Sequence, residues 1–70
     1  MTEQTEKMIA KKMIDADLKS RKELAKAVGM KYDTLLVRFE DPGTLRAFEI
    51  VSWAEALNLS DEEILQLVRG

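Results

Sequence analysis

The 70-residue sequence has no cysteine, no histidine, one proline and three glycines, and its aromatic residues are one tryptophan, one tyrosine and two phenylalanines. Without cysteine the chain forms no disulfide and offers no thiolate to a metal. Without histidine it also lacks the commonest general base and the commonest metal ligand. A nucleophile–base pair could be built only with lysine. We therefore expect no enzyme activity, no metal site and no cofactor.

Long apolar runs are missing as well. No stretch approaches the roughly 18 consecutive apolar residues of a membrane-spanning helix. The first eight residues, MTEQTEKM, are too polar for a signal peptide. These features predict a soluble, cytoplasmic protein with no membrane partner.

The charge of the chain is small in total and uneven in distribution. The net charge is −2, which by itself argues weakly against a nucleic-acid partner. Residues 1–40 nevertheless carry nine basic and seven acidic side chains, whereas residues 41–70 carry two basic and six acidic ones. This asymmetry suggests one face for an anion and another turned away from it. Ordinary solvated helix charge is the alternative explanation.

Hydrophobic periodicity predicts an all-α fold of five short helices in a single domain over residues 1–70. No stretch alternates in the manner of a β-strand. The first helix is expected to begin at Thr2 or Thr5, and Leu18 is expected to pack beneath the turn that follows it. The predicted core face of this helix consists of Ile9, Ala10, Met13 and Ile14.

The stretch from Ser20 to Phe39 is the most informative part of the chain. Ser20 and Glu23 form an S-x-x-E capping box, so a second helix is predicted over about residues 20–28. Gly29 ends this helix, because glycine adopts the left-handed conformation without a Cβ penalty. The predicted buried edge consists of Leu24, Ala25 and Val28.

A third helix is predicted over about residues 31–39, with Leu35 and Phe39 facing inward. Val37 and Asp33 then point nearly the opposite way, at 100° per residue. Two short helices joined by a tight turn that contains glycine are typical of a helix-turn-helix.

The rest of the chain is predicted to form two further helices. Asp41-Pro42-Gly43 is a turn signal, after which Thr44 is expected to cap a fourth helix. Asn58 is a plausible end of that helix, and Ser60 and Glu63 form a second capping box at the start of a fifth. In the fourth helix the predicted core stripe is Ile50, Trp53, Ala54 and Leu57, broadened by Ala47, Phe48 and Val51. In the fifth helix it is Ile64, Leu65 and Val68, with Leu67 off the stripe.

The motif ELAKAVG (residues 23–29) resembles the lambda-repressor-like DNA-binding domains of phage repressors and Cro proteins. Ala25 and Gly29 match that family's small residue and turn glycine. The segments TLLVRFEDPGTL (residues 34–45) and LNLSDEEILQLV (residues 57–68) look more specifically like small phage or mobile-element regulators of low-GC Gram-positive bacteria.

This resemblance covers about residues 18–68 and implies a compact five-helix lambda-repressor-like fold. It also implies a protein located in the cytoplasm of a bacterial host cell. Residues 31–39 would be the recognition helix. Arg38 departs from the wider family, in which repressors usually have a buried apolar residue at that position. The resemblance to the narrower group implies that Phe39 fills the core and leaves Arg38 at its edge.

The resemblance further implies that the third helix lies in the major groove of double-stranded operator DNA. Lys31 is suited to donate to guanine O6/N7, and Asp33 is suited to accept from cytosine N4. The residues implied to contact bases are Lys31, Tyr32, Asp33, Leu36 and Val37. Those implied to contact the DNA backbone are Arg21, Lys22, Thr34, Arg38, Thr44 and Arg46.

Other interpretations of these side chains stay open from the sequence. Asp33 also suits the first turn of a helix, where the dipole favours an acid. Leu36 also suits partial burial against the second helix, and Lys22 also suits a solvated helix surface. The outward face of the third helix lacks Asn, Gln or Arg at its centre, and Asp33 and Glu40 repel phosphates.

We therefore expect a sequence-specific DNA-binding transcriptional regulator of Cro or repressor type, bound to operator DNA as a homodimer and without a small-molecule ligand. The fifth helix and the acidic region between the fourth and fifth helices are candidates for the dimer surface. The alternative is a helix-turn-helix fold used as a protein–protein interaction module, such as an anti-repressor or adaptor, without specific DNA binding. The net acidity and the apolar, acidic recognition face favour that alternative.

Overall fold

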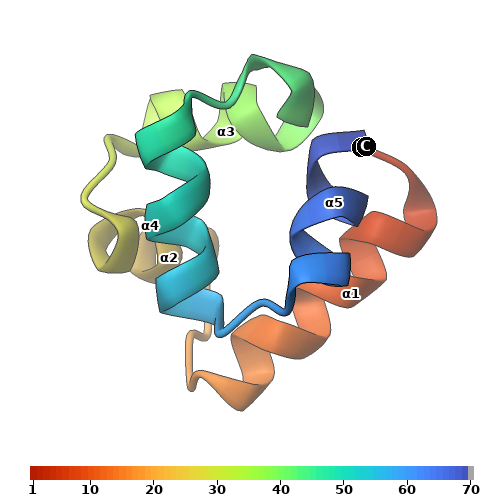
Figure 1. Cartoon of the computed structure of the whole chain (residues 1–70). Helices are drawn as coiled ribbons and strands as arrows, with labels where there is room; N and C mark the ends of the chain where they lie inside the picture. Colours follow the sequence, from red (N-terminus) through yellow and green to blue (C-terminus); the bar gives the residue numbers. More distant parts are fainter. Residues whose placement is uncertain (70) are drawn as a thin grey trace.

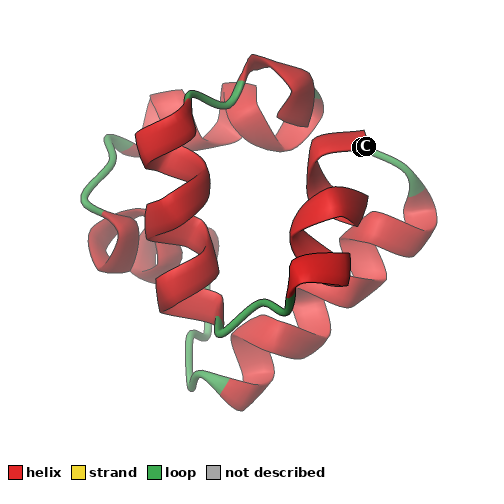
Figure 2. Ribbon diagram, viewed as in Figure 1, coloured by secondary structure: helices red, strands yellow, loops and turns green. Residues whose placement is uncertain are grey.

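The computed structural model describes residues 1–69 and shows, within that range, five α-helices, a short 3-10 helix and no strand (Figures 1 and 2). The predicted all-α class with five helices is therefore confirmed. The helices are α1 (Glu3–Asp15), α2 (Arg21–Val28), α3 (Tyr32–Glu40), η1 (Pro42–Thr44), α4 (Ala47–Leu57) and α5 (Asp61–Arg69). None of them has the length and apolar character needed to cross a membrane.

The helices enclose one hydrophobic core. α2 packs against both α3 and α4, while α1 packs against α4 and α5, and η1 contacts α3 and α5. Figure 1 shows α1 and α5 side by side, with α4 lying in front of α2. Trp53 is fully buried, and its ring centroid lies 5.3 Å from that of Phe39. The buried apolar residues are Ile9, Leu24, Ala25, Leu35, Phe39, Leu45, Trp53, Leu57 and Leu67.

Most helix ends were predicted correctly, because their signals are local. The Thr2 Oγ1 atom accepts the Thr5 N–H at the start of α1, at 3.2 Å. The Ser20 Oγ atom accepts the Glu23 N–H at the start of α2, also at 3.2 Å. Gly29, with φ +70°, ends α2, and Asn58, with φ +52°, ends α4. Both residues adopt the left-handed conformation that closes a helix.

The predicted core face of α1 is wrong at Ala10 and Ile14. Both side chains are exposed, and Ile14 is 76% exposed. The buried residues of α1 are instead Thr5 and Ile9, one turn apart, with Met13 partly buried a further turn along. Thr5 can occupy this stripe because its hydroxyl is hydrogen-bonded to that of Thr2, at 2.8 Å. Ala10 and Ile14 lie about 100° around the helix from it.

The predicted inner face of α5 is also wrong, because the helix is rotated. Leu67, predicted to lie off the core stripe, is 0% exposed, whereas Leu65 and Val68 are 53% and 42% exposed. The rotation places Glu63 toward α1, where its Oε1 atom lies 3.1 Å from Lys12 Nζ. Glu63 and Leu67 are one turn apart, so pairing the first with α1 also directs the second inward.

The start of α4 differs from the prediction as well. Thr44 does not cap α4, because it belongs to η1, and the N-cap of α4 is Arg46, two residues beyond Thr44. Asp41 stabilises η1 by accepting the Gly43 N–H at its side chain, at 3.2 Å. The later start brings Glu49 inside and leaves three predicted core residues exposed: Ala47, Phe48 and Val51. The stripe of Ile50, Trp53, Ala54 and Leu57 is buried or half-buried, as predicted.

Candidate nucleic-acid interface

The turn between α2 and α3 is closed by two backbone hydrogen bonds to the last turn of α2. The Met30 N–H donates to the carbonyl of Ala25 at 2.9 Å, and the Gly29 N–H donates to that of Lys26 at 3.3 Å. A Cβ atom added to Gly29 would have no neighbour within 4 Å. Glycine is therefore favoured here by its backbone conformation and not by lack of space. Beneath the turn, Leu24 and Leu35 are fully buried.

Four of the five predicted base-contacting side chains are exposed on the outside of α3. Lys31 is the N-cap and has an extended backbone, and Tyr32 and Asp33 occupy the first turn. Val37 lies one turn after Asp33 and is also exposed. Leu36 is half-buried, in line with the alternative interpretation of that residue. Thr34, a predicted backbone contact, is half-buried as well.

Two of the predicted cations at the start of α2 lie on aromatic rings that belong to α3. The Arg21 guanidinium carbon lies 4.6 Å from the centroid of the Phe39 ring, and Lys22 Nζ lies 5.6 Å from that of Tyr32. Cations so placed are attracted by the electron-rich face of the ring. Arg21 and Lys22 are both exposed, so these contacts orient their charges while leaving them open to solvent. The sequence prediction did not include these pairs.

The other predicted backbone contacts meet around Glu49, a residue that the sequence prediction missed. Arg38 Nε donates to Glu49 Oε1 at 3.0 Å, and the backbone N–H of Arg46 donates to the same oxygen at 2.8 Å. Arg38 Nη1 also donates to Thr44 Oγ1 at 3.4 Å, and that hydroxyl donates to the carbonyl of Asp41 at 2.7 Å. One buried carboxylate thus ties the end of α3 to the start of α4.

The Glu49 carboxylate stays ionised in this position. Burial acts to raise its pKa, but the hydrogen bonds from the Arg46 N–H and from Arg38, with the positive charges of both residues, lower the pKa below its ordinary value. The Arg38 charge is therefore largely balanced inside the protein, and its side chain is mostly buried. The exposed cations of α2, of α3 with its N-cap, and of the start of α4 are Arg21, Lys22, Lys26, Lys31 and Arg46.

A sequence signal for Glu49 does exist. Glutamate at the third helical position accepts the N–H of the N-cap residue in a capping box. Arg46 stands where Ser or Thr is usual, so the pattern is not recognisable as a box before the start of α4 is known. The Arg38 partner is eleven residues away and is unpredictable from helix periodicity.

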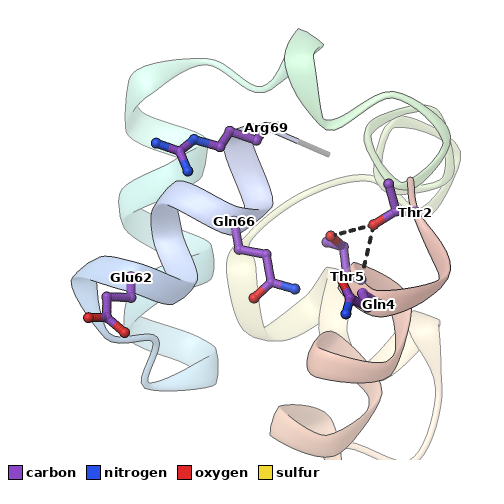
Figure 3. Close-up of a pocket in the computed structure, with 6 residues that line it drawn as sticks. All are labelled: Thr2, Gln4, Thr5, Glu62, Gln66 and Arg69. Carbon is purple, nitrogen blue, oxygen red and sulfur yellow. Dashed lines mark hydrogen bonds between the residues drawn. The ribbon is translucent and has the colours of Figure 1, made fainter.

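Two of the larger hollows of the described residues lie away from α3. No group of three or more acidic side chains in residues 1–69 is arranged to hold a metal ion. An open hollow of about 500 Å³ between α1 and α5 is polar, and Figure 3 shows the side chains around it: Thr2, Gln4, Thr5, Glu62, Gln66 and Arg69. A second hollow, of about 530 Å³, is apolar and lies between α4 and the start of α5.

Comparison of the chain with protein-family models gave no match, and comparisons with curated proteins and with solved structures gave none either. The functional interpretation therefore depends on the geometry of the molecule and on the sequence motifs.

Proposed function

We propose that α2 and α3 form a helix-turn-helix and that the protein belongs to the class of DNA-binding domains built on that unit. The observation that supports this most directly is the pair of short helices joined at Gly29. It has a serine-capped α2, a left-handed Gly29 and an α3 whose outer side exposes Lys31, Tyr32, Asp33 and Val37. In such domains the second helix of the pair enters the major groove with its N-terminal residues at the base edges.

Within that class we propose a lambda-repressor-like regulator of Cro or repressor type that acts as a homodimer on operator DNA. The support is the motif resemblance of residues 18–68 together with the five-helix arrangement. Such a protein regulates by occupying the promoter, without a ligand.

The positions of the charges suggest that different residues contribute to the affinity for DNA and to the recognition of its sequence. Arg21 and Lys22 at the start of α2, and Arg46 at the start of α4, would hold phosphates and contribute most of the affinity. On α3, Lys31 would donate to guanine, Asp33 would accept from cytosine and Val37 would contact a thymine methyl group. Arg38, being engaged by Glu49, would position α3 and would add little to phosphate binding.

A salt-dependent titration with mixed-sequence duplex DNA tests the proposal. Each phosphate contact contributes about 0.9 units to the slope of log K against log salt concentration. Arg21→Ala should weaken binding on all sequences and lower the slope by about one unit. Arg21→Lys, which keeps the charge, is the matched control and should leave the slope unchanged. Absence of binding at about 50 mM salt, where the electrostatic attraction is strong, would reject the proposal.

A protein-interaction module is the second candidate, and one observation favours it. Val37 is an exposed apolar side chain on the same face as the acidic Asp33. A face of that composition also suits a protein partner. In that case the wild-type chain would fail the DNA titration just described.

A further inference from the structure

We propose that the apolar hollow between α4 and the start of α5 is a docking site for a helix of a different protein, one that carries Lys or Arg beside large apolar side chains. The hollow is separate from the candidate nucleic-acid interface, because the side chains that line it all come from α4, from α5 or from the connection between them. The proposal does not depend on the proposed function and can be tested without DNA.

The hollow has a volume of about 530 Å³ and a mostly apolar lining. Ile50 and Leu59 are half-buried and pack against the hydrophobic core, whereas Val51 is exposed. Ala54 and Ile64 complete the apolar lining. In Figure 1, α4 and α5 run in opposite directions and are joined by a short connection, beside which the hollow lies. A bound helix would therefore contact both α4 and α5.

The exposed apolar surface extends beyond the hollow along both helices. Phe48 precedes Val51 by one turn of α4 and is also exposed. Val68 follows Ile64 by one turn of α5 and is exposed as well. A continuous exposed apolar surface of this kind is typical of a binding site for another molecule.

The protein cannot cover this surface by turning α4. Trp53 and Leu57 lie on the opposite side of that helix and are buried in the core, so turning Val51 inward would expose them. The ion pair of Glu49 with Arg38, at 3.0 Å, also fixes the rotation of α4. A second molecule is therefore needed to cover the surface.

The charges around the hollow indicate the chemistry of that molecule. Residues 47–68 contain five acidic side chains and no Lys or Arg. Glu55 lines the hollow, and Asp61 precedes Ile64 by one turn on the same side of α5. Both acids are exposed, and the ion pairs found in residues 1–69 involve neither of them. The apolar surface is therefore bordered by negative charge.

This negative border favours a basic protein partner over the other occupants of an apolar surface. Nucleic acid and anionic membranes would be repelled by it. A second copy of the same face would bring Glu55 and Asp61 against another acidic border, and facing like charges oppose association. A helix with apolar side chains on one side and Lys or Arg beside them complements both the hollow and its border, because amphipathic helices bind in apolar grooves.

Two designed peptides test the proposal. Both have about 14 residues, or about four helical turns, with leucine on one side of the helix. One peptide has lysine at its remaining positions, and the other has glutamate. NMR titration of the isotope-labelled wild-type chain with the lysine peptide should give saturable shifts of amide signals, concentrated in residues 50–64. The glutamate peptide should bind at least about tenfold more weakly.

Charge reversal at the border tests the electrostatic part of the proposal. The double variant Glu55→Lys and Asp61→Lys should bind the glutamate peptide more tightly than the lysine peptide. The matched control, Asp15→Lys and Glu40→Lys, makes the same change in net charge at the ends of α1 and α3 and should keep the wild-type preference. All four acids are exposed, so circular dichroism should show unchanged helicity for both variants.

Substitution of an exposed apolar residue tests the hydrophobic part. Val51→Ser should weaken binding of the lysine peptide about fivefold, because the valine side chain would be covered in the complex. The matched control is Ile14→Ser, which replaces an exposed apolar residue of α1 and should leave the affinity unchanged.

The proposal is overturned if the lysine peptide does not bind saturably, if the two peptides bind equally well, or if the charge-reversed variant keeps the wild-type preference. Unchanged affinity of Val51→Ser would overturn it as well. So would shifts in residues 50–64 that appear when the concentration of the chain alone is raised, because a second copy would then occupy the hollow. A chain that binds the lysine peptide as expected and fails to bind DNA would reject the proposed function and leave this docking site standing.

Discussion

Glu49 and Glu63 occupy the same position in two different helices, and their surroundings differ. Each is the third residue of its helix and accepts the backbone N–H of the N-cap residue at 2.8 Å. Each also pairs with a cation from another helix, Arg38 at 3.0 Å and Lys12 at 3.1 Å. The Glu49 side chain is 8% exposed, however, whereas that of Glu63 is 25% exposed. A glutamate at the third helical position therefore forms a buried ion pair between α3 and α4 in one case and a solvent-accessible ion pair between α1 and α5 in the other.

Burial changes what each pair does. The Glu63 pair is accessible to competing water, and within residues 1–69 no ion pair joins Lys12 to a third element. Around Glu49, the arginine also donates to Thr44, so three successive elements are connected. Desolvation makes such a pair costly to break, because removal of one partner leaves the other charge uncompensated.

Substitution of Glu49 should therefore have the largest effect. Glu49→Ala leaves the Arg38 guanidinium and the Arg46 N–H without their acceptor, and we expect a loss of about 3 kcal/mol in the free energy of unfolding. Urea denaturation measures it. The matched variant is Glu63→Ala, whose loss should be clearly smaller. Equal losses would show that burial does not distinguish the two sites.

Acid should weaken both sites. The pKa of Glu63 is lowered by the hydrogen bond from the Ser60 N–H and by Lys12, against a smaller opposing effect of desolvation, and the pKa of Glu49 is also lowered. A carboxylate whose folded pKa lies below its ordinary value of 4.5 stabilises the fold above that pH, and this stabilisation is lost as the pH falls through the folded pKa.

Thermal unfolding over a pH series measures this dependence. Glu49→Gln and Glu63→Gln should each flatten the fall in stability on the acid side of pH 4.5. If a variant loses stability in acid as the wild type does, the carboxylate that it lacks does not contribute to the pH dependence of stability.

The effect of added salt on stability should be the smallest of these effects, and it should distinguish Lys12 from Arg38. Lys12→Met removes an accessible charge from an accessible pair, so we expect a loss of less than about 1 kcal/mol that disappears at 1 M salt. Arg38→Met should destabilise more and should keep most of its effect at high salt, since screening reaches buried pairs poorly. The free energy of unfolding of both variants is measured at a series of salt concentrations. A loss for Arg38→Met that decreases with added salt would contradict the expectation that the buried pair is poorly screened.

These features also show how far the sequence predicts the molecule. Ser20, Gly29, Asn58 and Ser60 set helix ends through contacts with their own neighbours, and they were predicted correctly. The side that each helix buries depends on packing with other helices. The late start of α4 exposes Phe48, and the contact of Glu63 with α1 directs Leu67 inward. Both outcomes require contacts remote in sequence.

The candidate site divides in the same way. Exposure of Lys31, Tyr32, Asp33 and Val37 follows from α3 periodicity once Leu35 and Phe39 are inside, and it was predicted. The ion pair of Arg38 with Glu49 was not predicted, because it joins two helices across η1. The proposed contacts of these residues with DNA stay predictions.

Trp53 gives the protein an internal optical reporter. It is the only tryptophan, it is fully buried, and its indole N–H has no hydrogen-bond partner among the described residues. Its aromatic neighbour Phe39 belongs to α3 and lies on the side of that helix opposite the exposed Val37. Its fluorescence should therefore be blue-shifted and respond to separation of α3 from α4. A ligand that binds only to the outer face of α3 should leave the emission unchanged. One emission spectrum therefore distinguishes such binding from a change in the packing of α3 against α4.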